Sequence, residues 1–161
     1  MVITSTISIN HVWEILHQVT DPEVPVLTIT DLGIVRDVKI YGDEIEVVIT
    51  PTYTGCPAMD MIAMNIRMAL LENGYDKIKI TSVLSPAWTT DWMTEAGKLK
   101  LKEYGIAPPY TGSGNRSEPI VVCPQCSSSN TRLISEFGST ACKSLYQCND
   151  CKEPFDYFKC H

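Results

Sequence analysis

The distribution of cysteines is the feature that most constrains this chain. Six of the seven cysteines lie in the last 39 of 161 residues, and four of them form two Cys-x-x-Cys pairs. The pairs are Cys123 with Cys126 and Cys148 with Cys151, separated by 21 residues. Each pair directs two thiolates at one point, and two pairs supply the tetrahedral set of four sulfurs that zinc prefers. We therefore expect a metal site made of four cysteines.

The segment around these pairs is too short to fold on hydrophobic burial alone. Three short strands are expected in it, at residues 131–137, 143–147 and 155–159. Because about 40 residues bury too small a core, metal binding would supply most of the folding free energy. Structural zinc is favoured since the site is closed, although four sulfurs also suit iron or a transient iron–sulfur cluster.

Three further soft ligands occur close to these pairs in the sequence: Cys142, Cys160 and His161. Cys142 follows a turn that contains glycine, and the other two end the chain. Each could be chemically inert. Beside a metal site they are also candidates for a second, labile site or for an alternative ligand set.

A stretch rich in proline, glycine and serine precedes this tail, at residues 108–119. It has no apolar periodicity, which is typical of a linker. We therefore expect three parts: an α/β domain at residues 1–107, the linker at 108–119, and a cysteine-rich, zinc-ribbon-like domain at 120–161.

The first part alternates helical and strand patterns. The fold class we expect is α/β (α+β), a small mixed sheet with helices packed on it, followed by a small zinc-ribbon-like β domain. The elements expected in order are a helix near residues 10–20, strands at 34–41 and 44–50, a helix at 57–73, a strand at 77–84, and a helix from about 90 to 104. Gly42-Asp43 between the first two strands predicts a β-hairpin, and the helix at 57–73 is expected to be the crossover of a β-α-β unit.

Four methionines recur along the helix expected at residues 57–73. They are Met59, Met61, Met64 and Met68. Methionines at helical spacing usually fill a core, and this is our default interpretation. A partner-binding surface is the alternative.

The stretch Thr50-Pro-Thr-Tyr-Thr-Gly-Cys-Pro57 joins an expected strand to that helix. Gly55 lets the backbone turn, and Pro57 suits the first helical position. Cys56 would then lie at or near the N-cap, where unpaired N–H groups and the helix dipole stabilise a thiolate and lower the thiol pKa. Cys56 is therefore a candidate reactive thiolate, which could act as a nucleophile or as a metal ligand. The alternative is a small buried hydrophobic residue.

A loop rich in turn-forming residues carries the carboxylates Asp21, Glu23 and Asp31. The simpler interpretation is that they cap helix ends or Asx turns. Alternatively, the loop folds over Cys56 and supplies an acid or a hydrogen-bond partner. Nothing local in the sequence decides between the two.

The charge and hydropathy of the chain limit the partners and the cellular compartment that we expect for it. The formal net charge is −6, without the basic stripe that phosphate contacts require, which argues against nucleic acid as a partner. No apolar run is long enough to span a membrane, and the N-terminus lacks a secretory pattern. We therefore expect a cytoplasmic protein, where cysteine pairs bind metals more often than they form disulfides.

Two sets of motifs carry a family resemblance. The first set is Asp21-Pro-Glu23, Asp31-Leu-Gly33, Thr50 to Pro57, and Pro86-Ala-Trp88. The second is Cys123-Pro-x-Cys126, Phe137-Gly-Ser-Thr-Ala-Cys-Lys143, Cys148-x-x-Cys151, and Glu153 to His161. The chain resembles the PaaD family, whose members are encoded with phenylacetyl-CoA epoxidase, over nearly its whole length. Its N-terminal domain, at residues 1–107, resembles the wider family of cytosolic iron–sulfur assembly factors that includes SufT.

This resemblance implies a role in aerobic phenylacetate catabolism. In that system a di-iron oxygenase epoxidises the ring of phenylacetyl-CoA, and a reductase with flavin and a [2Fe–2S] centre supplies electrons. A PaaD protein would be a non-catalytic component of the ring 1,2-epoxidase. The sequence agrees, because it has no Glu-x-x-His pairs on long helices, no flavin fingerprint and no ferredoxin cysteine run.

Two functions from different classes follow, with the oxygenase and reductase subunits as expected partners. The first is a maturation factor that uses Cys56 to deliver iron or an iron–sulfur cluster. The second is a zinc-binding structural adaptor of the epoxidase complex. Thiol-dependent catalysis by Cys56 is the weaker third option, since no histidine is placed as its base. The sequence leaves open whether the chain forms a homo-oligomer.

Overall fold

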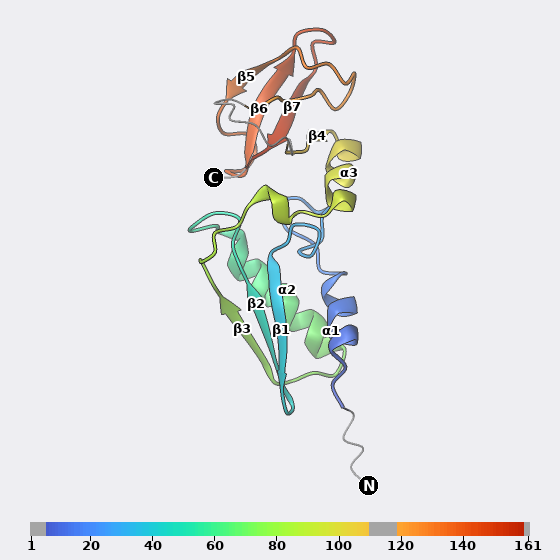
Figure 1. The fold of residues 1–161 in the computed structure, drawn as a ribbon, viewed down its shortest axis with the longest axis vertical. Helices are drawn as coiled ribbons and strands as arrows, with labels where there is room; N and C mark the ends of the chain where they lie inside the picture. Colours follow the sequence, from blue (N-terminus) through green and yellow to red (C-terminus); the bar gives the residue numbers. More distant parts are fainter. Residues whose placement is uncertain (1–5, 110–118, 160–161) are drawn as a thin grey trace. The chain divides into compact units, whose positions relative to one another are not determined.

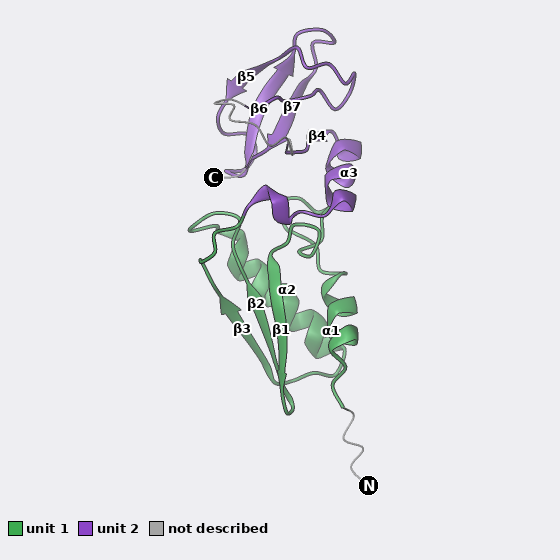
Figure 2. Ribbon diagram, viewed as in Figure 1, with its two compact units in different colours: residues 1–88 green, residues 89–161 purple. Residues whose placement is uncertain are grey.

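The computed structural model describes residues 6–109 and 119–159 (Figure 1). The chain forms two compact units, residues 1–88 and residues 89–161 (Figure 2). Each unit has its own sheet. This arrangement confirms the expected fold class, a mixed α/β unit followed by a small β unit.

The first unit is a three-stranded mixed sheet with two helices. Its strand order is β1-β2-β3, with β1 antiparallel to β2 and β2 parallel to β3. The predicted hairpin and β-α-β crossover are therefore confirmed. The elements are α1 (Ile9–Leu16), β1 (Val35–Tyr41), β2 (Glu44–Ile49), α2 (Ala58–Glu72) and β3 (Ile78–Ser82).

The core of this unit lies between the sheet and its helices. Ile62, Ile66 and Leu70 recur every four residues on α2 and are fully buried. The central strand β2 is buried from Ile45 to Ile49, because it has a neighbouring strand on each side. Helix α1 contacts both α2 and β1.

The default interpretation of the methionines is wrong for three of the four. Met61, Met64 and Met68 are exposed on α2, and Met59 is half-buried. The isoleucine and leucine row of α2 fills the core, so the residues on the opposite side of the helix face outward. Helical spacing alone did not indicate which row would be buried.

The second unit contains a four-stranded sheet of order β4-β7-β6-β5. Its elements are the 3₁₀ helix η1 (Thr90–Trp92), α3 (Glu95–Tyr104), β4 (Ile106–Ala107), β5 (Thr131–Ser135), β6 (Lys143–Cys148) and β7 (Pro154–Phe158). Gly105 ends α3 in a left-handed conformation with φ of 91°. This C-terminal turn lets β4 begin at the next residue and pair with β7.

The helix expected from about residue 90 to 104 is two elements. The Thr89 hydroxyl accepts the N–H of Asp91 and starts η1, and the Thr94 hydroxyl accepts the N–H of Gly97 and starts α3. The two N-caps explain why the helix is interrupted. The compact units divide between Trp88 and Thr89, so α3 and β4 group with the cysteine-rich tail.

A small apolar cluster forms the core of the second unit. Its members are Ala107, Val121, Cys123, Cys148, Phe155 and Tyr157, with Tyr146 packed against them. Two of them belong to the Cys-x-x-Cys pairs, so the metal ligands are part of the core.

None of the helices in the described ranges is long and apolar enough to cross a membrane.

Candidate metal centre and thiol site

The four cysteines of the two pairs meet at one point in the second unit. The Sγ atoms of Cys123, Cys126, Cys148 and Cys151 all lie within 4.8 Å of one another. Cys123 Sγ lies 3.7 Å from Cys151 Sγ, and Cys126 Sγ lies 3.6 Å from Cys148 Sγ. A tetrahedral metal with bonds of about 2.3 Å to sulfur places its ligands about 3.8 Å apart. The donors therefore fit a tetrahedral metal ion, and this is a metal-binding site.

Each Cys-x-x-Cys turn closes through a residue in the left-handed region. Ser127 has φ of 62° and Lys152 has φ of 68°, and each directly follows the second cysteine of its pair. In the second turn, the N–H groups of Cys151 and Asp150 bond to the Cys148 sulfur and lower its pKa to about 7, against the effect of burial. At Cys148 backbone donors thus favour the thiolate form that a metal requires, whereas burial and the neighbouring cysteines raise the pKa of Cys126 and Cys151.

Polar side chains link the two turns to each other. Ser128 and Asn130, which follow the first pair, donate hydrogen bonds to Asp150 between the cysteines of the second pair. These bonds lower the pKa of Asp150. Asn149 also donates to the Asn130 side chain at 3.0 Å. The ligand positions are therefore fixed by hydrogen bonds outside the four sulfurs.

Cys142 does not join the four-cysteine group. It is buried, and its Sγ lies 3.0 Å from the Thr140 hydroxyl. Cys160 and His161 lie outside the described residues. A second or alternative ligand set that includes these three residues therefore stays a prediction.

The Phe137 to Lys143 motif builds a close turn against β7. A Cβ atom on Gly138 would lie 2.5 Å from Asp156 Oδ1, so a larger residue there would displace the Asp156 side chain. Ser139 donates to Asp156 Oδ2 at 3.3 Å, and the buried Lys143 ammonium donates to Ser139 at 3.0 Å. These contacts give the motif a structural explanation.

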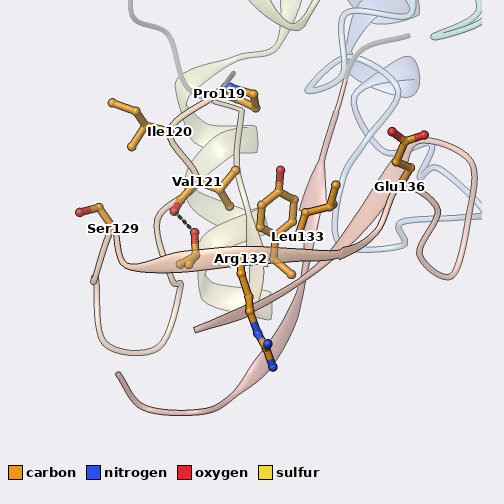
Figure 3. Close-up of a pocket in the computed structure, with 9 residues that line it drawn as sticks. Pro119, Ile120, Val121, Ser129, Arg132, Leu133 and Glu136 are labelled. Carbon is orange, nitrogen blue, oxygen red and sulfur yellow. Dashed lines mark hydrogen bonds between the residues drawn. The ribbon is translucent and has the colours of Figure 1, made fainter. Parts of the chain in front are cut away.

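A hollow of about 760 Å³ lies beside the edge strand β5 (Figure 3). Figure 3 shows Ile120 and Val121 on the segment that precedes β5, and Leu133 on the strand itself. The Thr131 hydroxyl donates to the Val121 carbonyl at 2.8 Å and joins the two segments. None of the four clustered cysteines lines this hollow, so it is separate from the metal centre.

Cys56 lies in the turn between β2 and α2, in the first unit. Pro57 is the N-cap of α2, so Cys56 precedes the N-cap by one residue and Pro57 is not the first helical residue as expected. The Cys56 N–H donates to the Tyr53 carbonyl at 3.3 Å, which closes the turn. The side chain is half-buried and bonds to the N–H of Ala58 in the first turn of α2. The predicted position near the helix start is confirmed.

The predicted pKa of Cys56 is wrong in direction. Burial of the sulfur raises the thiol pKa above its ordinary value, although hydrogen bonds from the Ala58 N–H and the Tyr53 side chain favour the thiolate. The carboxylates of Glu23 and Asp21 raise the pKa further. The helix start is one of several opposing influences, and desolvation is the largest. Near neutral pH the group is a thiol until a metal or a base removes its proton.

Two of the loop carboxylates stabilise turns, as the simpler interpretation expects, and a role as acid or hydrogen-bond partner of Cys56 stays a prediction. The Oδ1 atom of Asp21 accepts the N–H groups of Glu23 and Val24, each at 2.8 Å, and Asp31 accepts the N–H of Thr28 at 3.2 Å. Asp21 and Asp31 therefore stabilise turns. Asp21 and Glu23 also act electrostatically on Cys56, so the loop comes close to the thiol.

Two aromatic residues support this region. The Tyr53 side chain bonds to Cys56, a role that sequence reasoning missed; its position three residues earlier in the same turn was the available signal. The Trp88 indole is buried and donates to the Leu32 carbonyl at 2.7 Å. Trp88 therefore fixes the loop that carries Asp31.

Comparison with known proteins gives the family of this chain. It is 52% identical over 153 residues to a protein of Escherichia coli (strain K12) whose name makes it a subunit of 1,2-phenylacetyl-CoA epoxidase, covering 94% of this chain and 93% of that protein. The chain belongs to the PaaD family. Residues 107–159 match the family described as PaaD zinc beta ribbon domain, and residues 9–81 match iron-sulfur cluster assembly protein.

The iron–sulfur assembly part is found without the ribbon in other proteins. The chain is 36% identical over 88 residues to an Fe-S protein maturation auxiliary factor of Porphyromonas gingivalis (strain ATCC BAA-308 / W83), covering 53% of this chain and 83% of that one. The crystal structure of a DUF59 domain from Bacillus anthracis superposes with a TM-score of 0.54 at 28% identity, over 57% of this chain and 89% of that domain. This chain therefore joins a unit that matches iron-sulfur cluster assembly protein to a unit that matches the PaaD zinc beta ribbon domain.

Proposed function

We propose that this chain is a non-catalytic accessory subunit of a phenylacetyl-CoA epoxidase system, and that it delivers iron or an iron–sulfur cluster to the oxygenase or reductase. The name of the Escherichia coli relative supports the first part, and the name of the Porphyromonas gingivalis relative supports the second. The proposal places the chain in the cytoplasm, where its thiols stay reduced.

The observation that carries this proposal is the surroundings of Cys56. A half-buried thiol lies beside an amide N–H of α2, a tyrosine side chain and the carboxylates of Glu23 and Asp21. The carboxylates oppose the thiolate when no cation is present, and the same negative charge attracts a ferrous ion. Arrival of iron then displaces the thiol proton, so that cargo binding and deprotonation occur together.

Cys56 can supply only part of a cargo site. Among the residues that the structure describes, the four ribbon cysteines are the single group of three or more metal-ligating side chains whose donor atoms converge. In this proposal, iron held by Cys56 takes further ligands from a client, a small thiol or a second copy. Such incomplete ligation suits a carrier, because the client's thiolates can replace Cys56 by ligand exchange.

The four-cysteine site has a different role in this proposal. We assign zinc to it, held by Cys123, Cys126, Cys148 and Cys151, as a structural ion that links the two turns to the ribbon core. All four donors come from this chain, which suits a closed site rather than a transfer site.

The test compares epoxidase components matured with different versions of the chain. Wild-type chain, Cys56→Ser and Cys142→Ser are each co-expressed with the oxygenase and reductase, and the iron and cluster content of both clients is measured. We expect Cys56→Ser to lower client iron or cluster content and Cys142→Ser to leave it unchanged. Fully loaded clients with Cys56→Ser would contradict the delivery function.

A structural adaptor is the second candidate, and the raised pKa of Cys56 favours it because a protonated thiol is a weak ligand and nucleophile. In that case, removal of residues 120–161 would abolish co-purification with the oxygenase. Cys56→Ser would then leave both co-purification and client iron unchanged. The two candidates therefore give opposite results for the same variant.

A further inference from the structure

Helix α2 carries an exposed apolar stripe on the side away from its core row. Met61, Met64, Met68 and Leu71 have exposed fractions of 49%, 56%, 51% and 47%. We call these four residues the methionine seam. Single exposed apolar residues are ordinary, but four on one face of one helix form a contiguous surface that marks an interaction site.

The spacing of the seam fits a partner helix. Its residues follow one another by three, four and three positions, which is the a–d spacing of a helix that packs along another helix. The buried row Ile62, Ile66 and Leu70 anchors the opposite side of α2 in the core. Methionine side chains are flexible and polarisable, so they adapt to partner side chains of different shapes.

Charges around the seam indicate the character of the partner. Exposed carboxylates lie at both ends, Asp60 beside Met61 and Glu72 beside Leu71. The basic residue nearby, Arg67, donates to the Ile78 carbonyl at 3.0 Å and is thereby held toward β3. Residues 1–88 contain 11 acidic and 5 basic side chains, whereas residues 89–161 contain 8 of each. The net negative charge of the chain therefore belongs to the unit that carries the seam.

We propose that the methionine seam binds an amphipathic helix of a partner protein, with an apolar stripe against the four seam residues and lysine or arginine side chains near Asp60 and Glu72. The complementary charges would steer encounter and fix the direction of the helix. This interaction goes beyond the delivery function and does not require it, since Cys56 is not part of the seam.

The same charges disfavour a second copy of the chain as the occupant. An antiparallel pair of seams would bring Asp60 of one copy toward Glu72 of the other, and a parallel pair would bring like residues together. Like charges beside an apolar contact are destabilising. A partner helix with lysine or arginine side chains would make neither of these like-charge contacts.

The experiment uses the full chain and two synthetic peptides of leucine and lysine. One 14-residue peptide has its leucines at helical spacing, and the other has the same composition with strict alternation, which favours a strand. Each peptide carries a fluorophore, and binding is followed by anisotropy at two salt concentrations. We expect saturable binding of the helical peptide and at least about tenfold weaker binding of the alternating peptide.

Matched variants locate the contact. Met64→Gln with Met68→Gln keeps helix propensity and should weaken binding at least about tenfold, while Leu84→Gln, at a 60% exposed leucine elsewhere in the unit, should change it less than about twofold. Asp60→Asn with Glu72→Gln should weaken binding and reduce its salt dependence, and Glu44→Gln should do neither. Cys56→Ser should bind as the wild type does, so a failure of the delivery function would not affect this result.

Several results would overturn the proposal. They are equal binding of both peptides, absence of saturable binding, or binding that the Met64 and Met68 substitutions leave unchanged. Sedimentation velocity and vesicles of neutral lipid test the other occupants. Dimerisation or vesicle binding that disappears with the same double substitution would assign the seam to a second copy or to a membrane, and would also overturn it.

Discussion

The chain presents cysteine sulfur in two contrasting ways. In the ribbon, four sulfurs lie within 4.8 Å of one another, two of them inside the core of the second unit. In the assembly-type unit, Cys56 is a single half-buried thiol whose neighbours include carboxylates. The first arrangement is complete and closed, whereas the second offers one ligand near negative charge. In the function we propose, the first site holds its metal and the second site passes its metal on.

Removal of the metal is expected to have the largest effect, and it should unfold one unit and leave the other folded. A chelator added under reducing conditions should unfold the ribbon, because the free energy of binding zinc to four cysteines, about 10–16 kcal/mol, is also folding free energy. The first unit should keep its structure. Amide-proton NMR spectra of the full chain check this result, with Cys148→Ser as the matched variant. Ribbon signals that remain dispersed without metal would show that the metal is not what stabilises the second unit.

Alkylation of Cys56 tests the surroundings of the single thiol in the first unit. The rate of iodoacetamide reaction, followed by mass spectrometry of the Cys56 peptide as pH increases, should give an apparent pKa above that of an ordinary cysteine. Glu23→Gln should lower this pKa and speed the reaction at pH 8, because a negative neighbour is lost.

Tyr53→Phe is a control that should shift the Cys56 pKa in the direction opposite to Glu23→Gln. It removes a hydrogen bond that favours the thiolate, so it should raise the Cys56 pKa and slow the reaction. The ribbon cysteines should stay unmodified while metal is bound. Equal rates in Glu23→Gln, Tyr53→Phe and wild type would mean that the loop and the turn do not act on the thiol.

Acid should weaken the first unit in a way that one residue can test. The Thr81 hydroxyl donates to Glu46 at 2.6 Å, Lys79 lies 3.1 Å from it, and both lower the pKa of Glu46. A lowered folded-state pKa stabilises the fold above the unfolded pKa, about 4.3, and this stabilisation is lost as pH falls through the folded value. The urea midpoint of wild type should therefore fall more between pH 6 and 3 than that of Glu46→Gln. Parallel curves would contradict this role.

The smallest expected effect concerns the ribbon turns. Ser127→Gly should raise the thermal midpoint of the second unit by relieving a left-handed residue, a gain of up to about 1 kcal/mol. Ser129→Gly is the control, since Ser129 is not among the positive-φ residues and glycine there should destabilise. Equal effects of the two substitutions would show that the left-handed turn carries no cost.

The sequence indicated correctly those features that depend on local chemistry. The spacing within each Cys-x-x-Cys pair predicted the four-sulfur group, and Gly42-Asp43 between alternating segments predicted the β1–β2 hairpin. Such patterns are decided by residues a few positions apart. The family resemblance covered the remaining organisation, with an assembly-type unit before a ribbon.

The features that the sequence did not indicate depend on packing between distant segments. The pKa of Cys56 rises because burial and, to a smaller extent, the residue 21–23 loop act on it, and neither is visible in the turn around Gly55 and Pro57. The exposed side of α2 was decided by which apolar row packs on the sheet, and Ile62, Ile66 and Leu70 occupy that position. Long-range contacts of this kind override local pattern.

One experiment tests directly whether the four-cysteine site and Cys56 have different roles. Zinc-loaded chain receives ferric iron and sulfide without oxygen, with glutathione as the source of the remaining thiolates, and its metal content and sulfur-to-iron charge-transfer absorption are recorded. We predict that wild type gains this absorption and retains its zinc, and that Cys56→Ser retains zinc but gains no absorption. Equal absorption in Cys56→Ser, or iron that replaces zinc in the ribbon, would contradict the account.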